Sequence, residues 1–395
     1  MPGPLEGYRV LDLTTVGMGP YAAQTLGDLG ADVIKIESPE GDMLRTAAPG
    51  RSPGMSPLFL QTNRSKRSLV LDLKQAAGRA VLLRLAAKAD VLLTNIRPDA
   101  MARLGLSYDE VAAASPTIVY VSLVGYAQSG PYAPRPAFDD LIIGASGLAA
   151  LEAEMGGGPR YPPAWIADLT VGLFGVHAVM GALLHRARTG EGQAVEVPMF
   201  ECMTQFVLTP HLAAHTFRPA QGRAGYVRLF ERRPYKTRDG YIGAGAYTRA
   251  QWLRFFDLAG RPELKDDPRF ADALGIARHI GVLYGLFAET MLTATTAEWL
   301  ERFQAADIAA MPIHTPDSVQ DDPHLVATGF FQDVEHPTEG AIRTMAVPTR
   351  WSRSPPRPGR QAPRLGEHSR DILSEAGYGE AEIDDLVAAG VSVAR

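Results

Sequence analysis

The chain has 395 residues, of which 46% are hydrophobic and 21% are charged, a composition that excludes wholesale disorder. Lys and Arg total 39 against 44 for Asp and Glu, so the formal net charge is -5 and a dedicated nucleic-acid binder is not expected. At about 150 residues per domain, the length corresponds to two or three domains. Cys202 is the single cysteine, which excludes an internal disulfide and a thiolate zinc cluster.

The N-terminal residues show neither the basic nor the apolar segment of a secretory signal, so we expect a cytoplasmic protein. The longest apolar stretch covers residues 169–184 and contains His177 and three glycines. It is too short to span a bilayer. We therefore predict a buried core helix here and no membrane partner.

Strands and helices alternate in the first part of the chain. We predict strands over 8–13, 32–37, 68–71, 91–94 and 118–123, and helices over 21–29, 76–89 and 108–114. The strands are almost continuously apolar, as strands buried between helices are. The alternation predicts a doubly wound, Rossmann-like α/β domain with a parallel sheet.

The pattern changes further along the chain. A glycine- and proline-rich region over 130–163 precedes the core helix, and a strand follows at 194–197. A strand at 241–244 with amphipathic helices at 249–259, 282–292 and 296–305 predicts a second, smaller α+β domain. A helix at 368–376 lies near the end. The predicted organisation is a large domain over 1–200, a linker over 201–224, the small domain over 225–325, and a return linker with a C-terminal segment over 326–395 that packs on the large domain.

The turn after the first strand is similar to a dinucleotide-binding fingerprint. Gly17-x-Gly19-x-x-Ala22 opens the first helix, and Glu37 ends the next strand. A second interpretation is that the free N–H groups of this helix bind the phosphate of another nucleotide. A third is a tight turn that only requires small residues.

Two other clusters could bind ligands. Basic residues lie near several strand ends and could form either an anion site or a solvated face: they are Lys66, Arg67, Lys74, Arg97 and Arg103. His211 and His215 have the i, i+4 spacing of a zinc site, but the metalloprotease Glu and any nearby thiol are missing. We expect a packed or surface histidine pair and no metal.

Asp168 lies at the start of the apolar core helix. It could be the helix N-cap, a common position for aspartate. It could also be a nucleophile, because a carboxylate is ionised at neutral pH and needs no auxiliary base. Position alone does not decide between these two roles.

Motifs along nearly the whole chain give the decisive pattern. The chain resembles the class III CoA-transferases, a family that includes formyl-CoA and carnitine CoA-transferases and the α-methylacyl-CoA racemases. The matching stretches, in family order, are VLDLT at 10–14, Gly19-Pro20, LGDLGADVIKIE at 26–37, Gly41-Asp42-Met43, Asn63 with KRS at 66–68, LDLK at 71–74, NIRP at 95–98, RLG at 103–105, Ala167-Asp168 with Gly172, RTGEGQ at 188–193, DDP at 321–323 and LGEH at 365–368.

The resemblance implies a CoA-binding α/β domain, a small domain, and two chains interlocked as a homodimer. It implies that coenzyme A, and not NAD, lies against the first sheet. The residues that it assigns to CoA are Val16, Gly19, Leu71, Lys74, Asn95, Arg97 and Arg103. It implies that Asp168 is the nucleophile, forming an aspartyl anhydride and then an aspartyl-CoA thioester, with Asp139 as a helper. The expected partners are an acyl-CoA and a small carboxylic acid.

Three departures from the family pattern affect this prediction. Racemases of the family have a histidine at the position of Phe138, so the sequence favours a transferase. The glycine-rich flap of the transferases is matched only weakly by residues 222–225, and Ser38 stands where a CoA-binding arginine is frequent. A 2-methylacyl-CoA racemase or epimerase and a non-catalytic CoA-ester-binding protein remain alternatives.

Overall fold

The structure is a computed structural model that describes residues 3–230 and 232–393. The chain forms two compact units. The large unit consists of Met1–Glu152, Pro159–Thr209 and Gly329–Arg395, and the small unit consists of Ala153–Gly158 and Pro210–Thr328. Each unit has its own hydrophobic core.

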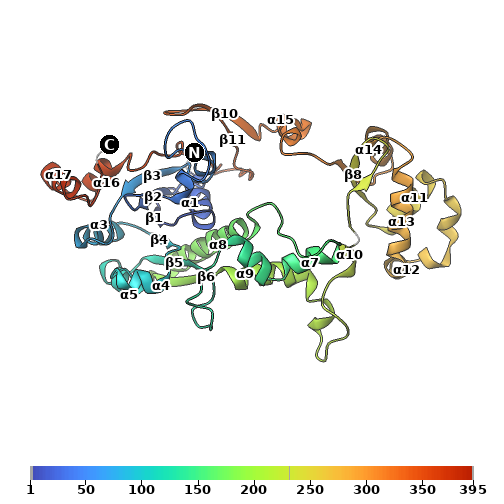
Figure 1. The fold of residues 1–395 in the computed structure, drawn as a ribbon, viewed down its shortest axis with the longest axis horizontal. Helices are drawn as coiled ribbons and strands as arrows, with labels where there is room; N and C mark the ends of the chain where they lie inside the picture. The colour runs from blue at the N-terminus through green and yellow to red at the C-terminus, as the bar shows by residue number, and fades with distance from the viewer. Residues whose placement is uncertain (1–2, 231, 394–395) are drawn as a thin grey trace. The chain divides into compact units, whose positions relative to one another are not determined.

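A six-stranded parallel sheet forms the centre of the large unit (Figure 1). Its order is β3-β2-β1-β4-β5-β6, and every neighbouring pair is parallel. This is the strand order of a doubly wound Rossmann fold, so the predicted fold class is confirmed. The strands are β1 (Arg9–Leu13), β2 (Asp32–Glu37), β3 (Lys66–Val70), β4 (Val91–Thr94), β5 (Val119–Val124) and β6 (Gln193–Pro198).

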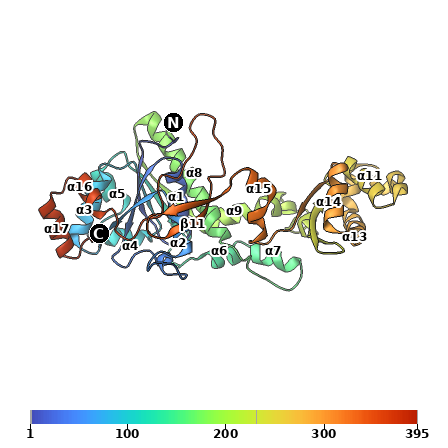
Figure 2. The same cartoon turned by 90° about the horizontal axis from the view of Figure 1, so that it is seen from above.

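Helices cover both faces of this sheet, because alternate strand residues are apolar on each face. Val10, Val33 and Val91 pack with α1 (Met18–Asp28) and α8 (Ile166–Thr189) on one face. On the other face, Figures 1 and 2 show α3 (Ala76–Ala86) grouped with two C-terminal helices. This unit also contains α2 (Pro57–Thr62), α4 (Pro98–Arg103), α5 (Tyr108–Ala114), α16 (Ser369–Glu375) and α17 (Glu380–Ala388).

Helix α8 is longer than the predicted core helix. Its 24 residues are long and apolar enough to cross a membrane by length and composition alone. However, Val171, Gly175 and Val179 are buried in the large unit's core, against α1 and the sheet. Gly172 allows the close approach of the two helices, because a Cβ atom there would lie 2.7 Å from the Met18 carbonyl oxygen.

Several segments differ from the prediction. The glycine- and proline-rich region contains α6 (Asp139–Ala145) and α7 (Leu148–Glu154). The predicted linker begins inside α9 (Met199–His211), whose Met203 and Val207 are buried, so the first half of that segment is helical. Near the end of the chain, β10 (Phe331–His336) and β11 (Gly340–Met345) form an antiparallel hairpin that the sequence analysis missed.

The small unit is built on a three-stranded antiparallel sheet and several helices, as predicted for an α+β domain. The sheet order is β7-β8-β9, from β7 (Tyr235–Lys236), β8 (Tyr241–Gly245) and β9 (Ala309–Pro312). Aromatic rings dominate its core: Phe255 stacks on Phe287 with centroids 4.3 Å apart. The helices of this unit include α10 (Val227–Phe230), α11 (Arg249–Leu258), α12 (Ala273–Arg278), α13 (Ile280–Met291), α14 (Thr296–Ala305) and α15 (Pro323–Ala327).

Candidate active site

The turn between β1 and α1 leaves the carboxyl end of the sheet's inner strand, next to the switch point between β1 and β4. Ligands of doubly wound folds bind at this position. Residue 19 must be glycine here, because a Cβ atom at this position would lie 2.2 Å from Thr14 Cβ and clash with it. Val16 has a φ of 69°, which is strained for a β-branched residue. Such strain is concentrated at functional sites.

Asp168 lies against this turn. It is the third residue of α8, whose N-cap is Trp165, so the N-cap interpretation of Asp168 is wrong. The side chain is 8% exposed. A Cβ atom added at Gly17 would lie 2.4 Å from Asp168 Oδ2. The absence of a side chain at residue 17 therefore leaves the space that the carboxylate occupies.

A second carboxylate lies beside Asp168. Asp139 is the first residue of α6, and its Oδ1 accepts a hydrogen bond of 2.9 Å from the Asp168 backbone N–H. Burial raises the pKa of Asp139, although backbone hydrogen bonds from Asp168 and Ala167 oppose the shift. The structure thus brings together both predicted catalytic residues, with Asp139 satisfying free N–H groups at the start of α8.

The surroundings of Asp168 change its acidity. Burial, and then the neighbouring Asp139 charge, raise the pKa of Asp168 to about 6, while a backbone hydrogen bond from Met18 opposes the rise. The carboxyl group is still mostly ionised at pH 7. The first turns of α1 and α8 both contribute positive dipole ends here, which favour negative charge on this group and on atoms bonded to it.

A pocket of about 350 Å³ opens above Asp168 within the large unit. Its wall includes Val16, Asn95 and Arg97, three of the residues assigned to CoA by the resemblance. Asn95 also fixes the turn, because its Oδ1 accepts from the Thr15 N–H at 3.0 Å and its Nδ2 donates to the Thr15 carbonyl at 2.8 Å.

The other assigned residues lie outside this pocket. Gly19 and Leu71 are buried, Gly19 beneath the turn and Leu71 directly after β3. Lys74 is exposed in the loop that follows β3, and Arg103 is exposed at the end of α4. The pocket therefore does not include either of these two cations.

Arg135 is a pocket residue that the sequence analysis missed. It lies in the connection between β5 and α6, and its guanidinium stacks on the Tyr132 ring at 3.9 Å. Neither Arg135 nor Arg97 forms an ion pair within residues 3–230 and 232–393. Two cations without an anionic partner therefore line the pocket, and Asp168 is the one carboxylate among its described lining residues. A periodic pattern could not have revealed Arg135, because it belongs to an irregular segment.

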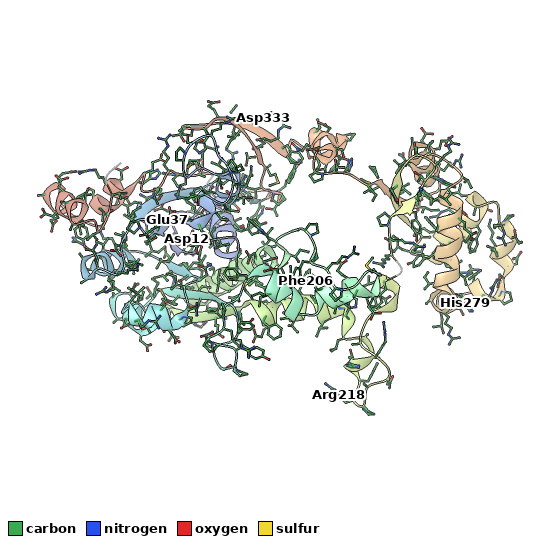
Figure 3. The ribbon with its side chains drawn as sticks, in the orientation of Figure 1. Asp12, Glu37, Phe206, Arg218, His279 and Asp333 are labelled. Carbon is green, nitrogen blue, oxygen red and sulfur yellow. The ribbon has the colours of Figure 1, made fainter. Side chains whose placement is uncertain are left out.

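Glu37, the acidic residue of the dinucleotide-binding fingerprint, is not available to a ligand. The Glu37 carboxylate is buried and bonded to Arg45, with Nη2–Oε2 at 2.7 Å, and to the Ser68 hydroxyl at 2.9 Å. Burial opposes ionisation, but the Arg45 hydrogen bond and the Lys35 charge dominate and lower the Glu37 pKa to about 2. Figure 3 labels Glu37 and Asp12 on neighbouring strands. Glu37 therefore has no free oxygen to bind a ribose.

The basic pair Lys66 and Arg67 is not an anion site. Lys66 is fully buried and bonded to Asp12 at 2.9 Å, and Arg67 pairs with Asp32 and Glu375, each at 2.7 Å. The anion-site interpretation is therefore wrong for these two residues. Their charges are already compensated inside the protein.

In the histidine pair, His211 is buried and bonded to the backbone. His211 is 8% exposed, and its Nδ1 accepts a hydrogen bond from the Tyr226 N–H at 3.1 Å. In the part of the chain that the structure describes, no group of three or more His, Cys, Asp or Glu side chains could hold a metal ion.

The fold is a doubly wound α/β fold with a pocket at the switch point of its sheet. The family model described as CoA-transferase family III matches residues 5–369, so the chain belongs to this family and is a class III CoA-transferase. Its activity is CoA transfer between an acyl-CoA and a carboxylate. Because the family includes racemases, it is the transferase names of the relatives that favour a transferase over the racemase and the non-catalytic binder.

Relatives named as CoA-transferases match nearly the whole chain. The succinyl-CoA:glutarate CoA-transferase of Mus musculus is 34% identical over 98% of this chain and 90% of its own length. The formyl-CoA:oxalate CoA-transferase of Streptomyces coelicolor is 31% identical over 98% of both chains. Among solved structures, a CaiB/BaiF family protein from Brucella suis matches with a TM-score of 0.81 and 30% identity, over 95% of this chain and all (100%) of that chain. Rv3272 from Mycobacterium tuberculosis has the same TM-score at 32% identity, over 94% and 99%.

Proposed function

We propose that the enzyme moves CoA from an acyl-CoA to a small carboxylic acid through covalent intermediates on Asp168. The observation that carries this proposal is the position of the Asp168 carboxylate. It is almost fully buried, it faces the pocket, and its pKa is raised to about 6. A carboxylate with little water around it but still ionised at pH 7 is a suitable nucleophile for an acyl carbon.

The proposed reaction has four acyl transfers. The Asp168 carboxylate attacks the donor thioester, the C–S bond breaks, and an acyl-aspartyl anhydride forms with release of the CoA thiolate. The thiolate attacks the aspartyl carbonyl, which releases the donor acid and leaves an aspartyl-CoA thioester. The acceptor carboxylate attacks this thioester, the C–S bond breaks with release of the CoA thiolate, and a second anhydride forms. The thiolate then attacks the acceptor carbonyl, which gives the new acyl-CoA and restores the Asp168 carboxylate.

The surrounding groups support these steps. Each attack places negative charge on an oxygen next to Asp168, and the Met18 N–H at the start of α1 is positioned to stabilise it. Asp139 holds the Asp168 backbone through the hydrogen bond to its N–H, so we propose that it positions the nucleophile. Phe138, which also lines the pocket, offers no group that transfers a proton.

CoA is a polyanion, and the unpaired cations Arg97 and Arg135 fit such a ligand. We propose that Val16 and Asn95 line the path of the CoA arm. Gly19, Leu71, Lys74 and Arg103 remain CoA-site proposals from the family resemblance. We propose CoA, and not NAD, as the nucleotide, since Glu37 is committed to Arg45.

The named relatives suggest the acceptor. The names of two relatives include glutarate and oxalate, which are both dicarboxylates. We therefore propose that the acceptor is a small dicarboxylic acid. From the resemblance alone, we further propose an interlocked homodimer in the cytoplasm, which sedimentation equilibrium and cell fractionation would test.

The test is intact-protein mass spectrometry after incubation with a panel of acyl-CoAs in the presence of hydroxylamine. Hydroxylamine attacks an anhydride or thioester and leaves a hydroxamate on the activated carboxyl. We expect a hydroxamate on Asp168 with the productive donors. Transfer activity without a hydroxamate on Asp168, or α-proton exchange in deuterated water without transfer, would contradict the proposal.

A further inference from the structure

Fully buried charges lie beneath the turn that touches Asp168. The Lys66 ammonium donates three hydrogen bonds of 2.9 Å, to Asp12 Oδ2, the Pro20 carbonyl and Asn63 Oδ1. The Lys35 ammonium donates to the Thr14 carbonyl and to Asp42 Oδ2, both at 2.9 Å. All four charged side chains have an exposed fraction of zero.

These side chains bond to the backbone of the turn and of the first helical residues. Asp12 Oδ1 accepts from the Thr14 N–H at 3.0 Å, and Asp42 Oδ1 accepts from the Val16 N–H at 3.2 Å. The lysines bind the Thr14 and Pro20 carbonyls. The backbone is thus held on both sides of Gly17 and Met18, the two residues that contact the Asp168 carboxylate.

The strain at Val16 shows that this conformation is imposed. A left-handed φ at a β-branched residue is unfavourable and persists only where the surroundings determine it. Its N–H is held by Asp42, and the preceding residue, Thr15, is held on both polar backbone atoms by Asn95. Without these bonds, we expect the turn to relax away from Asp168.

Stability alone does not explain these ion pairs. Two charges taken out of water pay a desolvation cost that often equals their attraction, so buried ion pairs are weak evidence for stability. A matched pair serves as the comparison. Arg64 and Asp28 are also buried, at 2.8 Å, but they lie at the opposite end of α1, away from the turn.

We propose that Lys66 and Lys35, with Asp12 and Asp42, are positioning residues of the transferase, which hold the β1–α1 turn where Gly17 and Met18 meet the nucleophile. The inference rests on the proposed role of Asp168. Its consequence is that loss of this charge network slows the chemical steps more than it weakens CoA binding.

The test compares Lys66→Met with Arg64→Met in the full-length enzyme, below the unfolding temperature of each variant. Both variants lose one buried ion pair. For Lys66→Met we expect kcat and the rate of hydroxamate formation on Asp168 to fall about 100-fold, as for a misplaced reactive group, with KM for the acyl-CoA within about threefold. For Arg64→Met we expect both rates within about threefold of wild type, with a lowered unfolding temperature.

A second variant covers the case in which Lys66→Met does not fold. Asp42→Asn keeps the shape and an oxygen for the Val16 N–H but removes the anionic partner of Lys35. We expect kcat to fall about 10-fold with little change in KM.

Equal losses in Lys66→Met and Arg64→Met, or a normal kcat in folded Lys66→Met or Asp42→Asn, would overturn the positioning role. Failure of both network variants to fold, with Arg64→Met folded, would also overturn it, since the residues would then serve the fold. Failure of the proposed function is distinct, because the wild-type enzyme itself would then form no hydroxamate on Asp168.

Discussion

The two units of the chain have cores of opposite character. The small unit's described core is aromatic, with Trp252, Phe255, Phe287 and Phe303 in contact, and its buried polar residues in the described ranges are His211, Thr237 and Thr290. The large unit's core contains many acids and bases: Asp12, Asp28, Lys35, Glu37, Asp42, Arg45, Arg64, Lys66, Arg67, Asp168, His336 and Glu339.

This difference separates stabilisation of the fold from positioning of the active-site groups. Aromatic burial stabilises a fold without directing particular atoms, since the hydrophobic effect is not directional. Charged hydrogen bonds have fixed geometry, and in the large unit they lead to the turn beside Asp168. Substitutions of the charged residues beneath this turn should therefore alter catalysis first, and substitutions in the small unit's core should alter stability first.

The largest effect is expected for Asp168→Ala. Turnover should fall on the order of 10³-fold or more, because no other carboxylate lines the described part of the pocket. CoA affinity, measured by calorimetry, should stay within a few-fold. Asp140→Asn is the matched control, since Asp140 is exposed and next to Asp139; turnover there should stay near wild type. Near-normal turnover in Asp168→Ala would contradict the mechanism.

Gly17→Ala should have the next largest effect. The added Cβ would lie 2.4 Å from Asp168 Oδ2, so the carboxylate or the turn must move. We expect kcat to fall about 10- to 100-fold. Gly181→Ala in α8 is the control, because nothing lies within 4 Å of its added Cβ. It should leave kcat unchanged and slightly raise the unfolding temperature. Equal kcat in the two variants would show that the contact has no catalytic consequence.

The acidity of Asp168 predicts a pH dependence. Because burial raises its pKa to about 6, the group becomes protonated as the pH falls through 6, whereas an ordinary aspartate would stay ionised. The value of kcat/KM should therefore decrease about tenfold per pH unit below 6. A profile flat down to pH 4.5, on enzyme shown to be folded there, would exclude Asp168 as the titrating nucleophile.

The smallest catalytic effect is expected for Phe287→Leu in the small unit. Phe287 is fully buried between Phe255 and Phe303, so the loss of ring contacts should reduce the free energy of unfolding by about 1–2 kcal/mol. Below the unfolding temperature, kcat should stay within about twofold. A large loss of kcat in folded protein would show that the small unit's core also directs the chemistry.

The sequence predicted the elements with a regular pattern. The strands over 32–37 and 91–94 and the helices over 108–114 and 296–305 match the structure to the residue, because apolar periodicity and caps such as Thr295 and Ser107 define them. Helices α6 and α9 were missed. The first lies among glycines and prolines, and the second follows β6 without a break.

The site was only partly predictable, because a sequence shows the type of a residue but not its burial or its partner. Lys66 was considered as an anion ligand, yet it is the buried partner of Asp12. Arg135 was missed because it lies in a loop. The position of a loop residue depends on the course of the backbone, which no periodic sequence pattern reveals. Asp168 was found through the family resemblance, and the structure adds the contacts with Gly17, Met18 and Asp139.

The most direct test of covalent catalysis is borohydride reduction of the enzyme after incubation with a productive acyl-CoA, followed by peptide mass spectrometry. Borohydride reduces an aspartyl-CoA thioester to an alcohol, which converts Asp168 into a homoserine residue, and it leaves a free carboxylate intact. We expect homoserine at position 168 only when acyl-CoA is present. An unreduced Asp168 in enzyme that is turning over, or a reduced carboxyl at another position, would contradict the aspartyl-CoA mechanism.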